Sequence, residues 1–222
     1  MRVAAVDVGI VNCGFCVVSS GAPPGAPPPP PALGLLEQRL ACGEVVVEEW
    51  QLVQLGSSKS ASAASTFERL VEFLRAREPQ LRDVDVLVVE QQMTARMKAL
   101  SACFYGAVRV LSPGTKVVFQ SASAKLNFGD LAAFLQQPSA PLASYAQRKK
   151  LAVAVTRRLA AHCPAALKAA FLAAKKKDDF SDALLHALAG LCIHTAPQQQ
   201  QPRTKAKAKA KNKARGTAHG PS

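Results

Sequence analysis

The sequence has few aromatic residues, since Phe, Trp and Tyr together make up 5% of its 222 residues. Apolar residues nevertheless make up 49% of the chain, which is enough to form a core. Because aromatic rings are scarce, Val, Leu and Ala must fill most of that core. A chain of this length is typical of one domain with short additional segments.

Long apolar runs are missing as well. No stretch reaches the roughly 18 consecutive apolar residues that a transmembrane helix needs, so no membrane partner is expected. The first apolar run, MRVAAVDVG, contains Asp7, and a charge at that place argues against a secretory signal. The sequence therefore predicts neither an integral membrane protein nor a secreted one.

The six cysteines lack a disulfide or zinc-binding pattern. Cys13 and Cys16 form a C-x-x-C, and no second such pair follows it. The pair lies in a predicted strand, where residues three apart point to opposite faces, so the two thiols are not expected to share an ion. We expect all six to be buried or incidental thiols in a reducing compartment.

Acidic residues are scarce: 15 Asp and Glu stand against 28 Lys and Arg, which gives a formal net charge of +13. Residues 197–222 contain basic residues but no acid, and almost no apolar side chain larger than Ala. We therefore expect a disordered, basic tail rich in Lys and Ala, while residues 1–196 remain basic without it. A surplus of this size favours an anionic partner, and nucleic acid is the first candidate.

The remaining patterns predict an α/β protein. Strands are expected at 2–8, 13–20, 44–50, 85–90 and 116–120, and helices at 62–78, 92–111, 145–163 and from 178 or 179 to about 193. The Pro-rich segment 21–40 is expected to be an insertion loop at a hairpin tip. Three consecutive strands favour antiparallel pairing, and strands separated by helices favour parallel pairing, so the sheet should be mixed, with helices on its faces.

Two acidic residues stand at the ends of predicted strands. Asp7 ends the first strand, and Glu90 ends the Val-rich strand DVLVVE. Ligands gather at the carboxyl ends of strands in open α/β sheets. An ionised acid in such a strand is costly unless it is paired or metal-bound. The alternative for Glu90 is a strand-end residue that reaches solvent.

The segment KKKDDFSDALLHAL places three more acids at a helix start. Asp179 and Asp182 are three residues apart and therefore share one helix face. Helix capping is the alternative reading, because acids are favoured in a first turn. Three acids in five residues exceed that need, and Asp178 is left as the cap or as a solvated residue.

Together these acids predict a metal site, formed by Asp7, Glu90, Asp179 and Asp182. Hard oxygen ligands suit Mg²⁺, and Mn²⁺ can substitute for it. Two such ions can clamp the attacking and leaving oxygens of a phosphodiester. An acidic site within a basic protein is thereby explained, since the ions neutralise the acids and the surrounding lysines hold the DNA backbone.

Four stretches resemble the poxvirus Holliday junction resolvases, which are RuvC-type nucleases of the ribonuclease H-like superfamily. They are AVDVGIVNCGFCVV, VLVVEQQM, RKKLAV and KKKDDFSDALLHAL, and the match spans most of residues 1–194. The resemblance implies a ribonuclease H-like domain over 1–196, with a mixed five-stranded sheet flanked by helices. It makes the four acids the metal ligands and places Lys149 near the scissile phosphate. Arg148, Lys150 and Lys125 stay open as alternatives for that lysine.

The function that the resemblance implies is a metal-dependent, structure-selective endonuclease. It would resolve four-way DNA junctions by paired symmetric nicks that leave 5′ phosphates, in concatemer resolution and recombination of viral DNA in the host cytoplasm. The near two-fold symmetry of a junction favours a homodimer. The helix at 92–111 is the candidate interface, with ordinary packing against the sheet as the alternative. Its residues at helical spacing are Met93, Met97, Leu100, Phe104 and Val108.

Three other functions remain as alternatives. The same acids would serve a nuclease acting on structured RNA or on other branched DNA. The stretch DVGIVNCG is also typical of proteins that bind nucleotide phosphates, but these need a second D-x-G motif and a second domain, so no nucleotide cofactor is expected. A non-enzymatic protein that coats nucleic acid through its tail would leave Glu90 and the D-x-x-D unexplained.

Overall fold

The computed structural model describes residues 1–21, 34–57, 61–126 and 144–195. The predicted tail at 197–222 lies outside the described residues, as does most of the predicted Pro-rich loop. None of the helices in the described ranges is long and apolar enough to cross a membrane.

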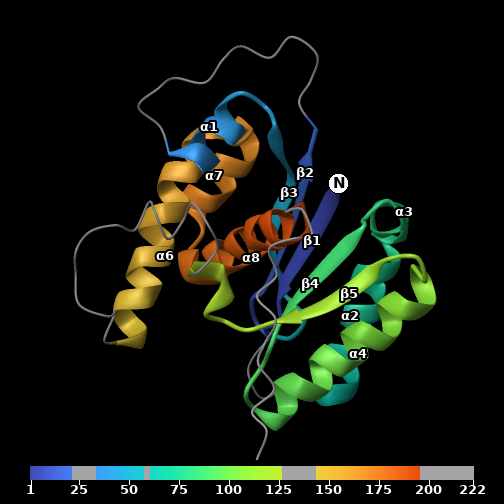
Figure 1. Cartoon of the computed structure of the whole chain (residues 1–222). Helices are drawn as coiled ribbons and strands as arrows, with labels where there is room; N and C mark the ends of the chain where they lie inside the picture. The colour runs from blue at the N-terminus through green and yellow to red at the C-terminus, as the bar shows by residue number, and fades with distance from the viewer. Residues whose placement is uncertain (22–33, 58–60, 127–143, 196–222) are drawn as a thin grey trace, which may run out of the picture.

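A mixed five-stranded sheet forms the centre of the molecule, as predicted (Figure 1). In spatial order its strands are β3 (Val45–Val53), β2 (Cys13–Ser20), β1 (Arg2–Asp7), β4 (Val86–Glu90) and β5 (Lys116–Gln120). Strands β1, β2 and β3 pair antiparallel, whereas β4 pairs parallel with β1 and β5. The expected change from antiparallel to parallel pairing is therefore confirmed.

The register between β1 and β4 places two acids at one edge of the sheet. Val6 pairs with Val89, so Asp7 and Glu90 are the next residues along their parallel strands. Strand β4 reads VLVVE and is buried throughout, because both faces of the sheet are covered by helices.

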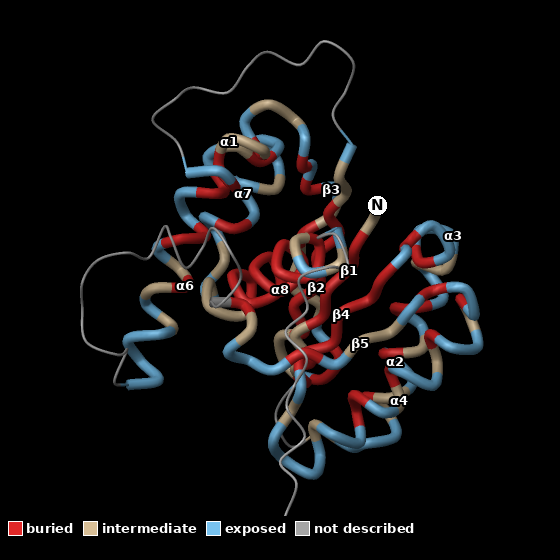
Figure 2. Tube along the Cα trace, in the orientation of Figure 1, coloured by how far each residue is buried: buried red, intermediate tan, exposed pale blue. Residues whose placement is uncertain are grey.

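Helices cover the sheet on both faces, and two separate apolar cores result. One face carries α1 (Leu35–Ala41), α6 (Tyr145–Leu159), α7 (Ala165–Ala173) and α8 (Lys177–Thr195). The other carries α2 (Ala63–Arg75), α3 (Glu78–Arg82) and α4 (Ala95–Leu111). Figure 2 shows that burial is concentrated in the sheet and in α8, whereas the outer surfaces of the other helices are exposed.

The structure differs from the sequence-based prediction in three details. Residues 35–41 belong to helix α1, although the sequence predicts an insertion loop over most of them. Helix α7 was not predicted, because its run AALKAAFLA is short and has no polar face to reveal a period. The helix predicted at 62–78 ends at Arg75, and Pro79 lies in the first turn of the separate helix α3.

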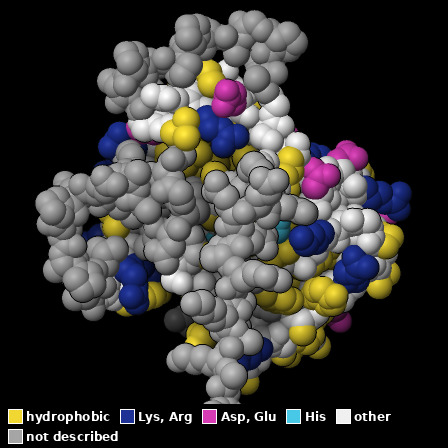
Figure 3. Space-filling view, viewed as in Figure 1, with side chains coloured by type: hydrophobic (Ala, Val, Ile, Leu, Met, Phe, Trp, Pro, Cys, Tyr) yellow, Lys and Arg dark blue, Asp and Glu magenta, His cyan; other side chains and the backbone are white. Residues whose placement is uncertain are grey.

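The predicted dimer interface on α4 is wrong for three of its five residues. Leu100, Phe104 and Val108 are at most 1% exposed, because they pack in the core between α4 and the sheet. Of the five predicted residues Met93 is exposed, and other positions of this region also bring apolar side chains to the surface. Figure 3 shows hydrophobic side chains over β5 and α4, where Tyr105 and Phe119 are exposed.

The C-x-x-C pair divides between the two cores, as predicted from strand geometry. Cys16 packs with α8 on one face of the sheet, and Cys13 packs with α2 and α4 on the other. Both are free thiols. Burial raises the pKa of the Cys13 thiol to about 12, so it stays protonated and unreactive.

Glycines allow α8 to lie close to the sheet. A Cβ on Gly14 of β2 would lie 2.6 Å from the main-chain oxygen of Asp179, and one on Gly190 would lie 2.6 Å from Val88 Cγ2. Only a residue without a Cβ fits at both places. The close approach of α8 to β2 therefore depends on Gly14. This approach occurs at Asp179, in the acidic first turns of the helix.

Gly14→Ala is expected to destabilise the fold by about 1–3 kcal/mol, because the methyl group meets helix backbone that cannot rotate away. Chemical denaturation followed by circular dichroism measures this change. Gly106→Ala in α4 is the matched control, since its new methyl group meets nothing within 4 Å, and it should stabilise by up to about 1 kcal/mol. Equal stability of the two variants would contradict the close approach.

Candidate metal centre

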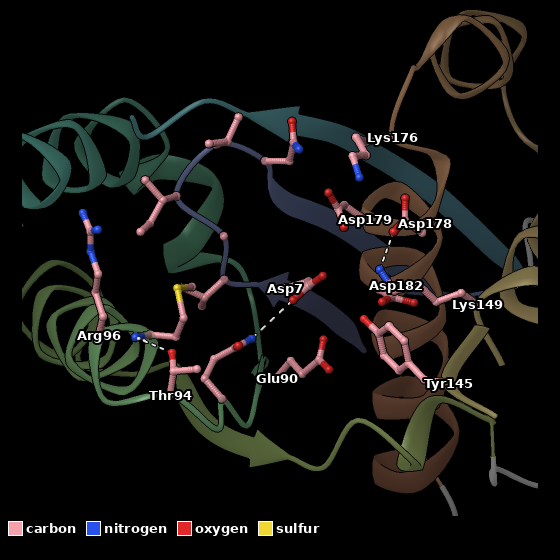
Figure 4. A pocket seen from close by; sticks show the side chains of 17 residues that line it. Asp7, Glu90, Thr94, Arg96, Tyr145, Lys149, Lys176, Asp178, Asp179 and Asp182 are labelled. Carbon is pink, nitrogen blue, oxygen red and sulfur yellow. Dashed lines mark hydrogen bonds and ion pairs between the residues drawn. The ribbon is translucent and has the colours of Figure 1, made fainter. Parts of the chain in front are cut away.

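Three carboxylates from three elements meet at the edge of the sheet. Asp7 from the end of β1, Glu90 from the end of β4 and Asp182 from α8 each offer an oxygen, and these oxygens lie within 4.8 Å of one another. Figure 4 shows Asp7 and Glu90 reaching towards the helix that carries Asp182. Residues that are 175 positions apart in the sequence thus form one acidic cluster, which we call the carboxylate triad.

The triad lies in a pocket of about 600 Å³. The loop after β1 and the start of α4 line one side, and α6 and the start of α8 line the other (Figure 4). Asp179 and Lys149 also line this pocket. The four acids named by the sequence therefore share one cavity, with Asp179 beside the triad.

The acids in this pocket repel one another, and the repulsion changes their pKa values. Burial raises the pKa of Asp7 well above its usual range, and the neighbouring Glu90 raises it further. Burial also raises the pKa of Asp179 to about 6, with added repulsion from Asp178 and Asp7. Crowded carboxylates of this kind favour a bound cation, because a positive charge relieves both the repulsion and the cost of burial.

A cation from the protein itself already lies against the triad. The Lys125 ammonium is 2.8 Å from Asp182 Oδ2 and 3.6 Å from Glu90 Oε1. Burial lowers the pKa of Lys125, but Asp182 and Glu90 outweigh that effect and hold its pKa above the usual range. The triad thus binds a positive charge in this structure, and its hard oxygen donors fit a divalent cation.

The sequence offers Lys125 only as one of the alternatives to Lys149 for the lysine near the phosphate. The residue follows β5 in the short 3-10 turn η1 (Ala124–Leu126), where no periodic pattern predicts its neighbours. Its place just after a strand end is the one signal that the sequence offered.

Lys149 is held at the rim of the pocket by Asp178. The two side chains form an ion pair, which joins α6 to the first turn of α8 (Figure 4). Burial raises the pKa of Asp178, but the bond from Lys149 outweighs this and lowers it overall. The neighbours Arg148 and Lys150 are exposed on α6, whereas Lys149 faces the pocket.

A buried histidine stands behind Glu90. His186 Nε2 lies 3.4 Å from Glu90 Oε2, and the Nδ1 atom of the same ring is hydrogen-bonded to Gln120 Oε1 at 2.7 Å. Burial lowers the pKa of His186 to about 4, so the ring is neutral and does not offset the charge of Glu90. His186 was not predicted as a site residue, although its place four residues after Asp182 puts it on the same helix face.

Aromatic packing fixes the start of α8. The Trp50 indole donates a hydrogen bond of 2.8 Å to the main-chain oxygen of Phe180 and stacks on Phe171 with a centroid distance of 5.0 Å. Phe180 lies between Asp179 and Asp182 in the sequence. The β3 tryptophan therefore sets where the acidic face of the helix meets the strand ends.

This chain is similar to known proteins in its fold and not in its sequence. No protein-family model and no curated protein sequence matches the chain. Among solved structures, Thermus thermophilus RuvC is 16% identical with a TM-score of 0.52, over 87% of this chain and 95% of that one. A fowlpox virus resolvase, solved with substrate Holliday junction DNA, is 15% identical with a TM-score of 0.54, over 88% and 100%.

The yeast mitochondrial Holliday junction resolvase is also similar. It is 13% identical with a TM-score of 0.52, and the match covers 84% of this chain and 77% of that one. Likeness at such low identity reports on the arrangement of helices and strands. The chain has the ribonuclease H-like fold of RuvC and of these two resolvases.

Proposed function

We propose that this protein is a metal-dependent, structure-selective endonuclease that resolves four-way DNA junctions by paired symmetric nicks. The observation that carries the proposal is the carboxylate triad, which lies at the strand ends of a fold shared with resolvases. The basic net charge supports a nucleic-acid substrate. The chemistry is hydrolysis of a phosphodiester that leaves a 5′ phosphate.

Asp7, Glu90 and Asp182, together with Asp179, are proposed to hold two Mg²⁺ ions, which Mn²⁺ can replace. When bound, such ions lower the pKa of a water nucleophile and neutralise charge on the leaving 3′ oxygen. The four carboxylates orient the site because each comes from a rigid strand end or from a packed helix. The loop after β1 bounds the cavity on the side opposite Lys149.

Lys149 is proposed to stabilise the negative charge of the scissile phosphate. Its ion pair with Asp178 keeps the ammonium at the rim of the pocket before DNA binds. A preorganised cation of this kind acts on the transition state without having to be repositioned.

Lys149→Met is expected to lower the rate of junction cleavage by about 10²-fold, with DNA affinity close to that of the wild type. Single-turnover cleavage and a gel-shift titration measure the two quantities. Lys150→Met removes the same charge from the exposed side of α6 and should retain the wild-type rate. A larger loss in Lys150→Met than in Lys149→Met would assign the phosphate-contacting role to Lys150.

The substrate is tested by comparing three labelled nucleic acids. An immobile four-way junction, a simple DNA duplex and a structured RNA are each incubated with the protein, with and without Mg²⁺. We expect Mg²⁺-dependent, symmetric nicks in the junction that DNA ligase can reseal. Preferred cleavage of the RNA would instead favour the alternative nuclease of the same fold.

The quaternary and cellular context follows from the same proposal. A homodimer would place two sites on two strands of a junction with two-fold symmetry. Residues 1–196 would form the nuclease domain, and the basic residues of 197–222 would add affinity for any DNA that weakens with salt. We assign the activity to viral DNA recombination and concatemer resolution in the host cytoplasm.

A further inference from the structure

Lys125 is a buried lysine that shares its charge between two acids of the carboxylate triad. The residue is 9% exposed, and its turn η1 packs against α8. Lysine is rarely buried unless it is paired. Its ammonium contacts Asp182 Oδ2 and Glu90 Oε1, whereas Asp7 completes the triad without an ion pair to Lys125 among the described residues.

A divalent ion would need those same two carboxylates. Ions such as Mg²⁺ bind carboxylate oxygens at roughly 2.0–2.1 Å, which brings a double positive charge against the ammonium. Like charges at such short range repel strongly in a poorly hydrated site. The ammonium and the ion therefore compete for Glu90 and Asp182.

We propose that Lys125 is an internal counter-ion that stabilises the metal-free site and is displaced when divalent ions bind. The inference rests on the proposed function, because it assigns the metal to the carboxylate triad. Without an ion, the Lys125 ammonium lies between the carboxylates of Glu90 and Asp182. It thereby links the end of β4 to α8 and offsets the repulsion between the two acids. When an ion binds, the flexible four-carbon stem of the lysine lets the ammonium move away without moving the backbone.

The two lysines near the site therefore have different functions. Lys149 is paired with Asp178, which lies outside the triad, so an ion at the triad does not need the partner of Lys149. Lys125 is paired with Asp182 and Glu90, so binding of an ion costs the protein both contacts. Removal of Lys125 should consequently change metal affinity and metal-free stability in opposite directions.

The test replaces Lys125 with neutral residues and omits DNA. Lys125→Met is titrated with Mn²⁺ by calorimetry, and its thermal unfolding is recorded in EDTA. We expect the Mn²⁺ dissociation constant to fall at least about tenfold, since the competing charge is gone. In EDTA the unfolding temperature should fall by roughly 5–10 °C, because buried carboxylates lose their partner.

Two further variants keep the test decisive. Lys125→Gln removes the charge but keeps a polar end, and it should show the same two opposite changes even if the methionine variant fails to fold. Lys116→Met removes an exposed lysine from the far end of β5 and should alter neither quantity.

Mn²⁺ binding that is unchanged or weaker in the folded Lys125 variants would overturn the counter-ion role. Wild-type protein that binds Mn²⁺ normally in the same experiment would leave the proposed function intact. If the wild-type protein bound no Mn²⁺, this result would contradict both the counter-ion role of Lys125 and the proposed nuclease function. The two failures are therefore distinguishable.

Discussion

Asp182→Asn is expected to abolish junction cleavage, with a loss of at least about 10³-fold, while junction binding is retained. Asp182 is the one triad residue that comes from α8, so its loss leaves Asp179 as the only proposed metal ligand on that helix. Asparagine keeps the shape of the side chain but removes the charge that a divalent ion needs. The effect is measured by single-turnover cleavage of a labelled four-way junction in Mg²⁺.

Retained binding separates loss of chemistry from loss of the fold. DNA affinity depends mainly on contacts between basic side chains and phosphates, and Asp182→Asn removes none of these. The variant should therefore shift a labelled junction in a gel as the wild type does. Asp182→Asn relieves repulsion on Asp7 but leaves the buried Lys125 with Glu90 as its charged partner, so circular dichroism must show that the variant is folded before cleavage is compared.

The control for this prediction removes an acid of the same type elsewhere. Asp83 has a side chain that is 76% exposed and makes a long ion pair of 3.6 Å with Arg2. Asp83→Asn should cleave the junction at the wild-type rate. A nuclease rate in Asp182→Asn above about a tenth of the wild-type rate would show that the chemistry does not depend on the carboxylate triad.

The strand-end acids could be predicted because parallel neighbouring strands end at the same edge of a sheet, so the last residues of two such strands lie close together. Val-rich strands with an acid as the last residue predict that Asp7 and Glu90 share an edge, since parallel neighbours end together. The D-x-x-D spacing likewise predicts a common helix face for Asp179 and Asp182. The spacing cannot predict which of these two carboxylates lies closer to the strand ends. That depends on how α8 is rotated about its axis on the sheet.

Other parts of the site were beyond the reach of sequence patterns. Lys125 and His186 contact Glu90 through tertiary packing, and neither lies in a motif that distinguishes a partner of an acid from a surface residue. Asp178 was predicted to be a helix cap or a solvated residue, whereas the structure pairs it with Lys149 on another helix. Long-range ion pairs of this kind depend on helix placement, which local periodicity does not determine.

The close packing of α8 on β2 gives Gly14 a structural role that the sequence alone does not show. Glycine within a strand is usually unfavourable, because it has no side chain to pack. In β2 the missing Cβ admits the main-chain oxygen of Asp179. The residue that weakens the strand therefore brings the acidic helix within reach of the strand ends.

Trp50→Ala is expected to destabilise the fold strongly, by about 3–5 kcal/mol, which is more than Gly14→Ala should cost. The side chain is 1% exposed and fills the space between β3 and the start of α8. It stacks on Phe171 and contacts the edge of Phe180 with ring centroids 5.1 Å apart. A loss of this size is a large part of the roughly 5–15 kcal/mol that stabilises a typical domain.

Denaturant titration followed by circular dichroism measures the loss, because the variant lacks the only tryptophan and gives no indole fluorescence. For a domain of this size, the midpoint of thermal unfolding should fall by about 6–20 °C. Trp50→Phe keeps a ring in the cavity but removes the hydrogen bond to Phe180 and part of the packed volume, so it should cost about 1–3 kcal/mol, less than Trp50→Ala. Phe119→Ala, which truncates a ring that is 48% exposed, should cost less than either.

The same substitution tests the link between packing and the site. Trp50 has no contact with the pocket, but its hydrogen bond is to the residue between the two acids of the D-x-x-D. Trp50→Ala should therefore weaken Mn²⁺ binding even at temperatures at which the variant remains folded, whereas Phe119→Ala should leave it unchanged. Full Mn²⁺ affinity in folded Trp50→Ala would mean that the contacts of α8 with β1 and β2 position Asp179 and Asp182 without the tryptophan.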